Sequence, residues 1–102
     1  MTIKIIFNFN ELFISVGMDV GADFTWMSMA LPNQTFLGKP IKIIHYSIDS
    51  LELTVSKIKE AEELYSLKSH SFLESTGIYR YPLFYFLRDK GFSYSVINPI
   101  IT

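Results

Sequence analysis

The chain has 102 residues, enough for one small domain, with 49% hydrophobic residues and a formal net charge of -1. The absence of cysteine excludes disulfides, cysteine-bound zinc and thiol chemistry, and it agrees with a cytoplasmic protein. Ten acidic residues balance nine basic ones, so charge alone gives no support for nucleic-acid binding. No run of about 18 apolar residues occurs, and we expect no membrane span.

The first strand carries a conflict. We interpret residues 1–13 as a leader or extra strand, and residues 13–20 as a strand whose alternate residues Ile14, Val16, Met18 and Val20 share one face. Its nearly continuous apolar run predicts a central strand covered on both faces. Asp19 interrupts this run between Gly17 and Gly21. A carboxylate among apolar residues costs free energy unless it is paired, and flanking glycines indicate close approach of backbone or ligand.

The middle of the chain predicts two more strands and a helix. Residues 24–31 and 41–46 are strand-like, with a turn at 32–34 between them. Asp49–Glu52 has the form of a capping box. The apolar residues that then repeat at helical spacing are Leu51, Val55, Ile58, Ala61 and Tyr65. The charged residues that predict a solvated face are Lys57, Lys59, Glu60, Glu62 and Glu63.

The last third predicts strand, helix and strand. Residues 70–74 are a short strand, and a helix runs from about Tyr79 to Lys90, with Pro82 in its first turn and Gly91 as its stop. Residues 92–97 alternate and form the last strand. The order is therefore three strands, a helix, a strand, a helix and a strand, which predicts a mixed α/β sheet.

Two acidic residues are the candidate site. Asp19 ends the first strand and Glu74 ends the strand that follows the first helix. If these strands are neighbours, both carboxylates lie at the edge where open α/β sheets bind ligands. Two close carboxylates repel unless a cation or proton lies between them, and Mg²⁺ prefers such oxygen ligands. The alternative is structural: an aspartate at a strand end is a common turn residue, and Glu74 can cap the next helix.

At these residues the chain resembles a family. Residues 16–21, VGMDVG, look like the opening strand of RuvC-like nucleases. Residues 73–79, LESTGIY, then Pro82-Leu83, Gly91-Phe92 and the VINP of 96–99 resemble the N-terminal domain of DEDD-type transposases of the insertion-sequence 110 family. The resemblance runs from about residue 14 to the end, so residues 14–102 are identified as a partial RNase H-like domain.

The resemblance implies a fold and a chemistry. The family's domain is RNase H-like, and four acids bind Mg²⁺ or Mn²⁺ for DNA strand cleavage and exchange. Asp19 matches the first acid and Glu74 the second, which implies catalytic and metal-binding roles. The other two belong to a segment after Asn98-Pro99 that this sequence does not contain, so we expect a chain truncated at its C-terminus, weak metal binding and no cleavage by the chain alone. Family members act as homo-oligomers with a guide RNA.

Other residues have two interpretations each. Ser75 and Thr76 either contact a phosphate or cap the helix, and Tyr79 is a candidate substrate contact. Phe24, Trp26 and the aromatic residues of 83–87 could stack on bases, but we expect them in the core. We expect His45 and His70 to be ordinary strand residues.

Two further functions compete with the transposase. One is a different RuvC-like nuclease, which would carry its third acid in a later helix. The other is a non-catalytic remnant that binds intact transposase subunits. A sugar-kinase-like nucleotide site also begins with a strand of this kind, but it needs a second glycine-rich phosphate loop that the sequence lacks.

Overall fold

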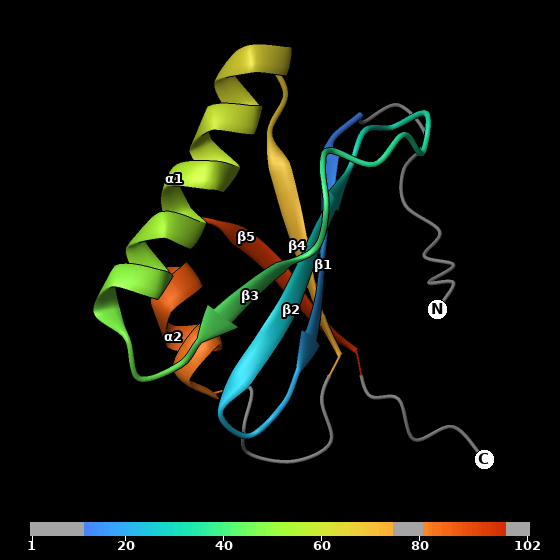
Figure 1. Cartoon of the computed structure of the whole chain (residues 1–102). Helices are drawn as coiled ribbons and strands as arrows, with labels where there is room; N and C mark the ends of the chain where they lie inside the picture. Colours follow the sequence, from blue (N-terminus) through green and yellow to red (C-terminus); the bar gives the residue numbers. More distant parts are fainter. Residues whose placement is uncertain (1–11, 75–80, 98–102) are drawn as a thin grey trace, which may run out of the picture.

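In the computed structural model, residues 12–74 and 81–97 are described, and they form one sheet with two helices (Figure 1). The elements follow each other as β1 (Ile14–Val20), β2 (Phe24–Ala30), β3 (Ile41–Ile44), α1 (Ile48–Tyr65), β4 (Ser69–Glu74), α2 (Tyr81–Asp89) and β5 (Ser93–Ile97).

The sheet has five strands in the spatial order β3-β2-β1-β4-β5. Strand β2 pairs antiparallel with both β1 and β3, whereas β4 pairs parallel with both β1 and β5. Helix α2 links β4 to β5, whereas the connection from β1 to β4 contains β2, β3 and α1. Parallel strands need crossover connections of this length. The mixed sheet expected from the sequence is present, and β1 is its central strand.

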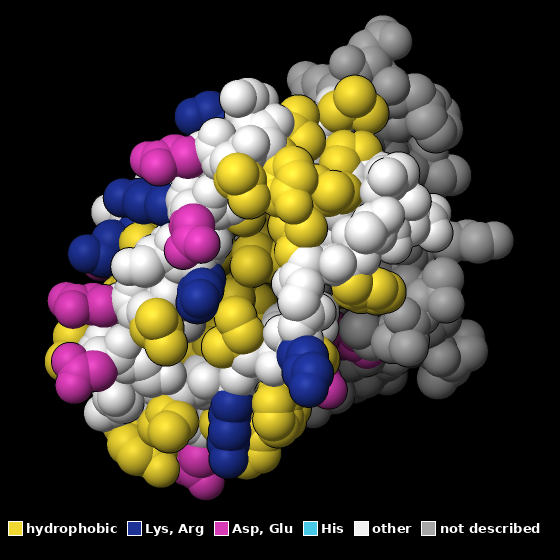
Figure 2. Space-filling model, turned by 45° about the horizontal axis from the view of Figure 1, so that its top comes forward, with side chains coloured by type: hydrophobic (Ala, Val, Ile, Leu, Met, Phe, Trp, Pro, Cys, Tyr) yellow, Lys and Arg dark blue, Asp and Glu magenta, His cyan; other side chains and the backbone are white. Residues whose placement is uncertain are grey.

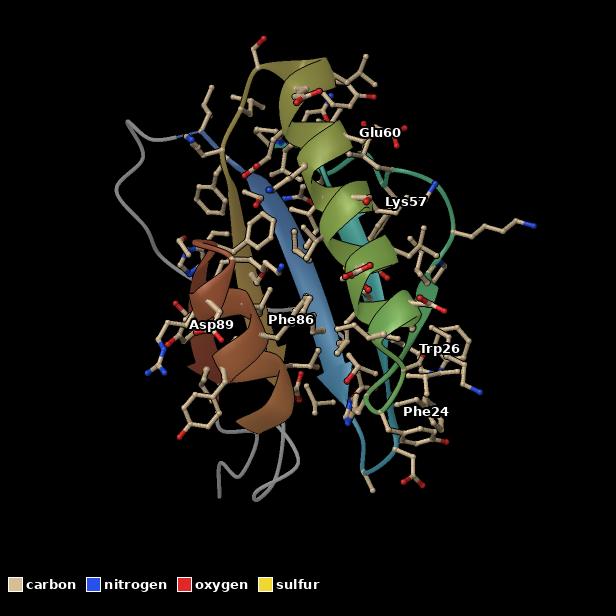
Figure 3. All side chains as sticks on the ribbon, turned by 90° about the vertical axis from the view of Figure 1, so that its left-hand side faces the viewer. Phe24, Trp26, Lys57, Glu60, Phe86 and Asp89 are labelled. Carbon is tan, nitrogen blue, oxygen red and sulfur yellow. The ribbon has the colours of Figure 1, made fainter. Side chains whose placement is uncertain are left out.

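The core lies on one face of this sheet. Both helices pack on the same side, in front of the sheet in Figure 3. The buried residues that form the core are Ile14, Val16, Met18, Val20, Met27, Met29, Ile43, Val55, Ile58, Ala61, Leu73, Leu83, Leu87 and Phe92. The expectation that β1 is covered on both faces is therefore wrong for the described elements. On its other face Ser15 and Gly17 are half-buried and Asp19 is exposed.

Helix α1 begins earlier than predicted. Its N-cap is Ser47, whose Oγ accepts a hydrogen bond from the backbone N–H of Ser50 at 3.2 Å. The hydroxyl oxygen of Ser50 in turn accepts from the N–H of Ile44 at 2.9 Å. These two serines end β3 at Ile44 and begin the helix. The strand is therefore shorter than the predicted range 41–46, and the helix cap is Ser47 and not the predicted capping box that begins at Asp49.

The end of α1 is fixed to β4 by a side chain. The Glu62 carboxylate accepts hydrogen bonds from the N–H and the hydroxyl of Ser69, at 2.8 and 2.9 Å. Glu62 is thus half-buried, and its predicted place on the solvated face is wrong. Lys57, Lys59, Glu60 and Glu63 are exposed as expected.

Helix α2 ends at the predicted glycine. Gly91 has a φ of +78°, and the N–H of Phe92 donates to the carbonyl oxygen of Leu87 at 3.0 Å, which is a glycine-terminated helix end. The predicted start of this helix at Tyr79 lies outside the described residues. Neither α1 nor α2 has the length and apolar character needed to cross a membrane.

Candidate metal and nucleic-acid site

The fold brings Asp19 and Glu74 together. They are direct register partners on the parallel strands β1 and β4, which run side by side to the same edge of the sheet in Figure 1. Residues paired in this way point to the same face. That face is the one opposite the helices, because the alternate β1 residues Val16, Met18 and Val20 are buried in the core. Asp19 is exposed and Glu74 is half-buried.

The two glycines beside Asp19 have different reasons to be there. A side-chain methyl at Gly21 would lie 3.0 Å from the carbonyl oxygen of Phe24, because Gly21 makes a tight backbone turn with a 2.9 Å hydrogen bond to that same oxygen. A methyl at Gly17 would come no closer than 3.9 Å to the Ser28 carbonyl. Packing therefore explains Gly21 but not Gly17, and Gly17 leaves the sheet open beside the carboxylates.

A row of residues crosses all five strands at the level of the acids. Lys42 on β3 pairs with Trp26 on β2, Trp26 with Asp19, Asp19 with Glu74, and Glu74 with Ile97 on β5. We call these five residues the cross-strand row. A cation and an aromatic ring thus flank the carboxylate pair on one side, and an apolar residue flanks it on the other.

The aromatic part of this surface was missed by sequence reasoning. Phe24 and Trp26 are 39% and 46% exposed, so the expectation that they belong to the core is wrong. Their rings meet edge to face with centroids 6.3 Å apart, and Lys42 Nζ lies 4.4 Å from the centre of the Phe24 ring. Figure 3 shows Phe24 and Trp26 together at the β2–β3 side of the molecule, away from the core between helices and sheet.

The donor set fits a hard divalent cation. Mg²⁺ is commonly bound by one or two carboxylates and keeps several waters, and a pair of neighbouring carboxylates open to solvent meets that need. Bound here, such an ion would supply Lewis-acid stabilisation of phosphate oxygens and an activated water. Within residues 12–74 and 81–97, no group of three or more acidic or histidine side chains converges on a common point. The predicted contacts Ser75, Thr76 and Tyr79 lie outside the described residues.

Both histidines have structural partners. His70 lies in β4 and contacts the hydroxyl groups of Ser93 and Ser95 on β5, the second at 2.7 Å. Burial lowers the pKa of its imidazole below the ordinary 6.5. His45 follows β3 in a turn and its Nε2 lies 2.7 Å from the Thr25 hydroxyl. Burial lowers the pKa of His45 as well, although a backbone hydrogen bond at Ala22 and the charge of Asp23 act in the opposite direction.

Among solved structures, two that are similar to the chain share little sequence identity with it. The chain is similar to T. thermophilus RuvC, solved in complex with Holliday junction substrate, with a TM-score of 0.53 and 8% identity over 86% of this chain. It is also similar to an Aquifex aeolicus member of the Ppx/GppA family, with a TM-score of 0.43 and 15% identity over 86% of the chain. The chain spans 66% of the RuvC chain and 36% of the Ppx/GppA chain.

No model of a known protein family matches the chain, and no curated protein matches its sequence. These comparisons therefore show the fold alone. The five-stranded mixed sheet and its two helices have a RuvC-like, RNase H-like fold, as the sequence resemblance implied.

Proposed function

We propose that this chain forms part of a metal-dependent domain that cleaves DNA strands, with Asp19 and Glu74 as acidic metal ligands. The observation that carries the proposal is the register pairing of these two acids at the carboxyl edge of parallel strands. Open α/β sheets bind their ligands at this position. The RuvC-like fold agrees with such a site.

The finer form of the proposal is a DEDD transposase of the insertion-sequence 110 family, of which residues 14–102 are a partial catalytic domain. It rests on the residues that resemble that family, from Val16 to Pro99. A guide RNA and assembly into homo-oligomers belong to this finer form. The finer form requires four acids, so catalysis requires more than Asp19 and Glu74.

Two residues beside the acids are candidate contacts for a nucleic acid. Lys42 is exposed and placed to contact a phosphate, and Trp26 offers a ring face on which a base can stack. Because Asp19 and Glu74 carry the same sign of charge as the phosphate backbone, the backbone approaches them favourably only when a cation neutralises them. DNA binding on this face is therefore expected to depend on the divalent metal.

Metal binding is tested first, with Mn²⁺ as an observable substitute for Mg²⁺. Electron paramagnetic resonance of free Mn²⁺ during titration of the purified chain should show weak binding at a single site. Asp19→Asn and Glu74→Gln should each reduce the affinity at least about tenfold, because each removes a charged ligand. Asp23→Asn is the matched control, since Asp23 is exposed in the turn just after β1. Equal affinity in all four proteins would contradict the proposed ligands.

Nucleic-acid binding is tested with the single tryptophan of the chain as the reporter. Addition of a single-stranded DNA oligonucleotide in Mg²⁺ should quench the fluorescence of Trp26, and quenching should be lost in Asp19→Asn. Lys42→Ala should weaken binding, whereas Lys59→Ala, an exposed lysine on α1, should not. Binding that is unchanged when Mg²⁺ is removed, or no binding at all, would contradict a metal-dependent DNA site.

A further inference from the structure

An apolar hollow lies between α1 and the segment that leads from β2 into β3. Its volume is about 610 Å³, which is within the range of cavities that hold small ligands. Its apolar walls include Leu31, Phe36, Leu37, Ile41, Leu64 and Tyr65. Figure 2 shows hydrophobic side chains gathered in the hollow, with charged side chains along the flank of the helix. The hollow therefore offers a concave surface to an apolar ligand.

Three large apolar side chains around this hollow remain open to solvent. Phe36, Leu64 and Tyr65 have 70%, 72% and 39% of their surface exposed. The rings of Phe36 and Tyr65 contact no other aromatic ring within residues 12–74 and 81–97. Apolar residues scattered singly over a surface need no explanation, whereas a group of them around a hollow indicates a binding surface.

The charged residues of the hollow favour an anion. Lys39 precedes β3 on one wall, and Lys57 projects from α1 on the other. Among the described residues that line the hollow, Glu60 is the acidic one, and Figure 3 shows it leaving α1 on the same side as Lys57. Neither lysine has an ion-pair partner in the described ranges 12–74 and 81–97. Two cations against one carboxylate leave the rim with a net positive charge, and the flexible lysine stems allow both ammonium groups to approach one head group.

A peptide strand is a poorer occupant, because the free edge of β3 is partly closed. The N–H of Ile44 donates to the Ser50 hydroxyl at 2.9 Å, and its carbonyl oxygen accepts from the N–H of Ser47 at 3.2 Å. Pro40, which precedes the strand, has no N–H to donate. A strand of four residues with these groups blocked gives an added strand few backbone partners.

We propose that this hollow binds a free alkyl carboxylate, that is, an anionic amphiphile. The apolar tail lies against Leu64 and Tyr65, and the carboxylate lies between the ammonium groups of Lys39 and Lys57. Burial of the tail drives binding, and the two lysines select the sign of the head group. The inference is independent of the proposed function, because the hollow lies on the helix side of the sheet and Asp19 lies on the opposite face.

The test is calorimetric titration of the purified chain with decanoate below its micelle concentration. One decanoate should bind per chain, and octanoate should bind about tenfold more weakly, because it buries two fewer methylenes. Lys39→Glu and Lys57→Glu should each weaken decanoate binding at least about tenfold, since each replaces an attraction by a repulsion. Decyltrimethylammonium should bind the parent more weakly than decanoate does. It should bind the double variant Lys39→Glu/Lys57→Glu more tightly than decanoate does, because both rim charges are then reversed.

Two controls match these changes at exposed positions of α1 that do not line the hollow. Lys59→Glu makes the same charge change and should leave decanoate binding unchanged. Leu64→Ala should weaken binding severalfold, whereas Leu53→Ala should not. The circular dichroism spectrum of each variant should match that of the parent, because every substituted side chain is exposed.

No decanoate binding by the parent overturns the proposal. Equal affinity of the parent for decanoate and decyltrimethylammonium overturns it as well, because the rim charges then select nothing. Decanoate binding that is unchanged in both Lys39→Glu and Lys57→Glu places the ligand outside this hollow and has the same consequence.

Discussion

Single residues around the acid pair show why the strand can carry a charge at all. Asp19 is tolerated because it ends β1 on the face opposite the helices and remains in solvent, so its carboxylate avoids the cost of burial. Gly21 allows the tight turn into β2. Gly17 lies on the same face as Asp19, where a methyl would make an ordinary van der Waals contact with the Ser28 carbonyl. The charge of Asp19 in an apolar strand is therefore tolerated because its side chain is exposed on one face of the sheet. Packing does not explain the glycine at position 17.

The two glycines should respond differently to the same substitution. Gly21→Ala should destabilise the fold by roughly 1–3 kcal/mol, because its methyl would press on the Phe24 carbonyl at 3.0 Å. Gly17→Ala should be neutral or stabilise by up to about 1 kcal/mol, since the methyl fits and the unfolded chain loses freedom. Urea denaturation followed by circular dichroism measures both. Equal losses in the two variants would show that Gly17 is also constrained by packing.

At the scale of elements, a pair of side-chain hydrogen bonds connects α1 to β4. Two hydrogen bonds from Ser69 to one Glu62 oxygen hold the C-terminal turn of the helix to the first residue of the strand. Ser69 itself is buried, so its N–H and hydroxyl depend on this carboxylate. The same strand then delivers Glu74 to Asp19, and the placement of α1 on β4 therefore contributes to the geometry of the candidate site.

Removal of this acceptor should be costly. Glu62→Ala should lower the free energy of unfolding by roughly 1.5–3 kcal/mol, because it leaves two buried donors of Ser69 without a partner. Glu62→Gln keeps one oxygen acceptor and should lose less. Glu63→Ala is the control at a neighbouring exposed position and should change stability by less than about 0.5 kcal/mol. If Glu62→Ala matched Glu63→Ala in chemical denaturation, the hydrogen bonds would contribute nothing to stability.

Across the whole molecule, stability should depend on pH through the histidines. Burial lowers the pKa of both His45 and His70, so below about pH 6.5 the unfolded chain takes up protons that the folded chain resists. Their contribution to stability is complete above pH 6.5 and is lost as the pH falls through the lowered folded values.

The chain should therefore unfold at lower urea concentration at pH 5.5 than at pH 7.5. Carboxylates also titrate toward acid, so the informative quantity is the difference between proteins. His70→Gln, which can still hydrogen-bond to Ser93 or Ser95, should show a smaller loss between these pH values than the parent. An identical pH dependence in the parent, His45→Gln and His70→Gln would show that neither imidazole contributes.

Local sequence patterns predicted much of this fold, but they could not predict which face of the sheet the helices cover. Alternation in β1 and the glycine stop at Gly91 follow from residues next to one another in sequence, and both are confirmed. In β2, alternation separates Phe24 and Trp26 from Thr25, Met27 and Met29 but does not say which set is covered. Hydrophobicity favours the aromatic set, yet the helices cover the other one. The prediction for the start of α1 was wrong for a similar reason. The Ser50 hydroxyl accepts a hydrogen bond from the N–H of Ile44 in β3, which is a contact between two elements.

The candidate site was predictable in part. The order of elements placed Asp19 and Glu74 at strand ends, and their proximity was expected on the condition that the two strands are neighbours. The pairing of β1 with β4 meets that condition. The cross-strand row could not be predicted, because it needs the register of four strand pairs at once. A one-residue slip in any pair would move Lys42, Trp26 or Glu74 to the opposite face.

The central position of β1 has a consequence for the order of folding. Its pairing with β2 closes a tight turn, whereas its pairing with β4 must close a long loop that contains β2, β3 and all of α1. Long loops are slow to close, because their entropy is lost before the contacts form. We therefore expect the hairpin to form early and the two carboxylates to meet late. Any partly folded form in which only the hairpin is paired would then present Trp26 and Asp19 without Glu74.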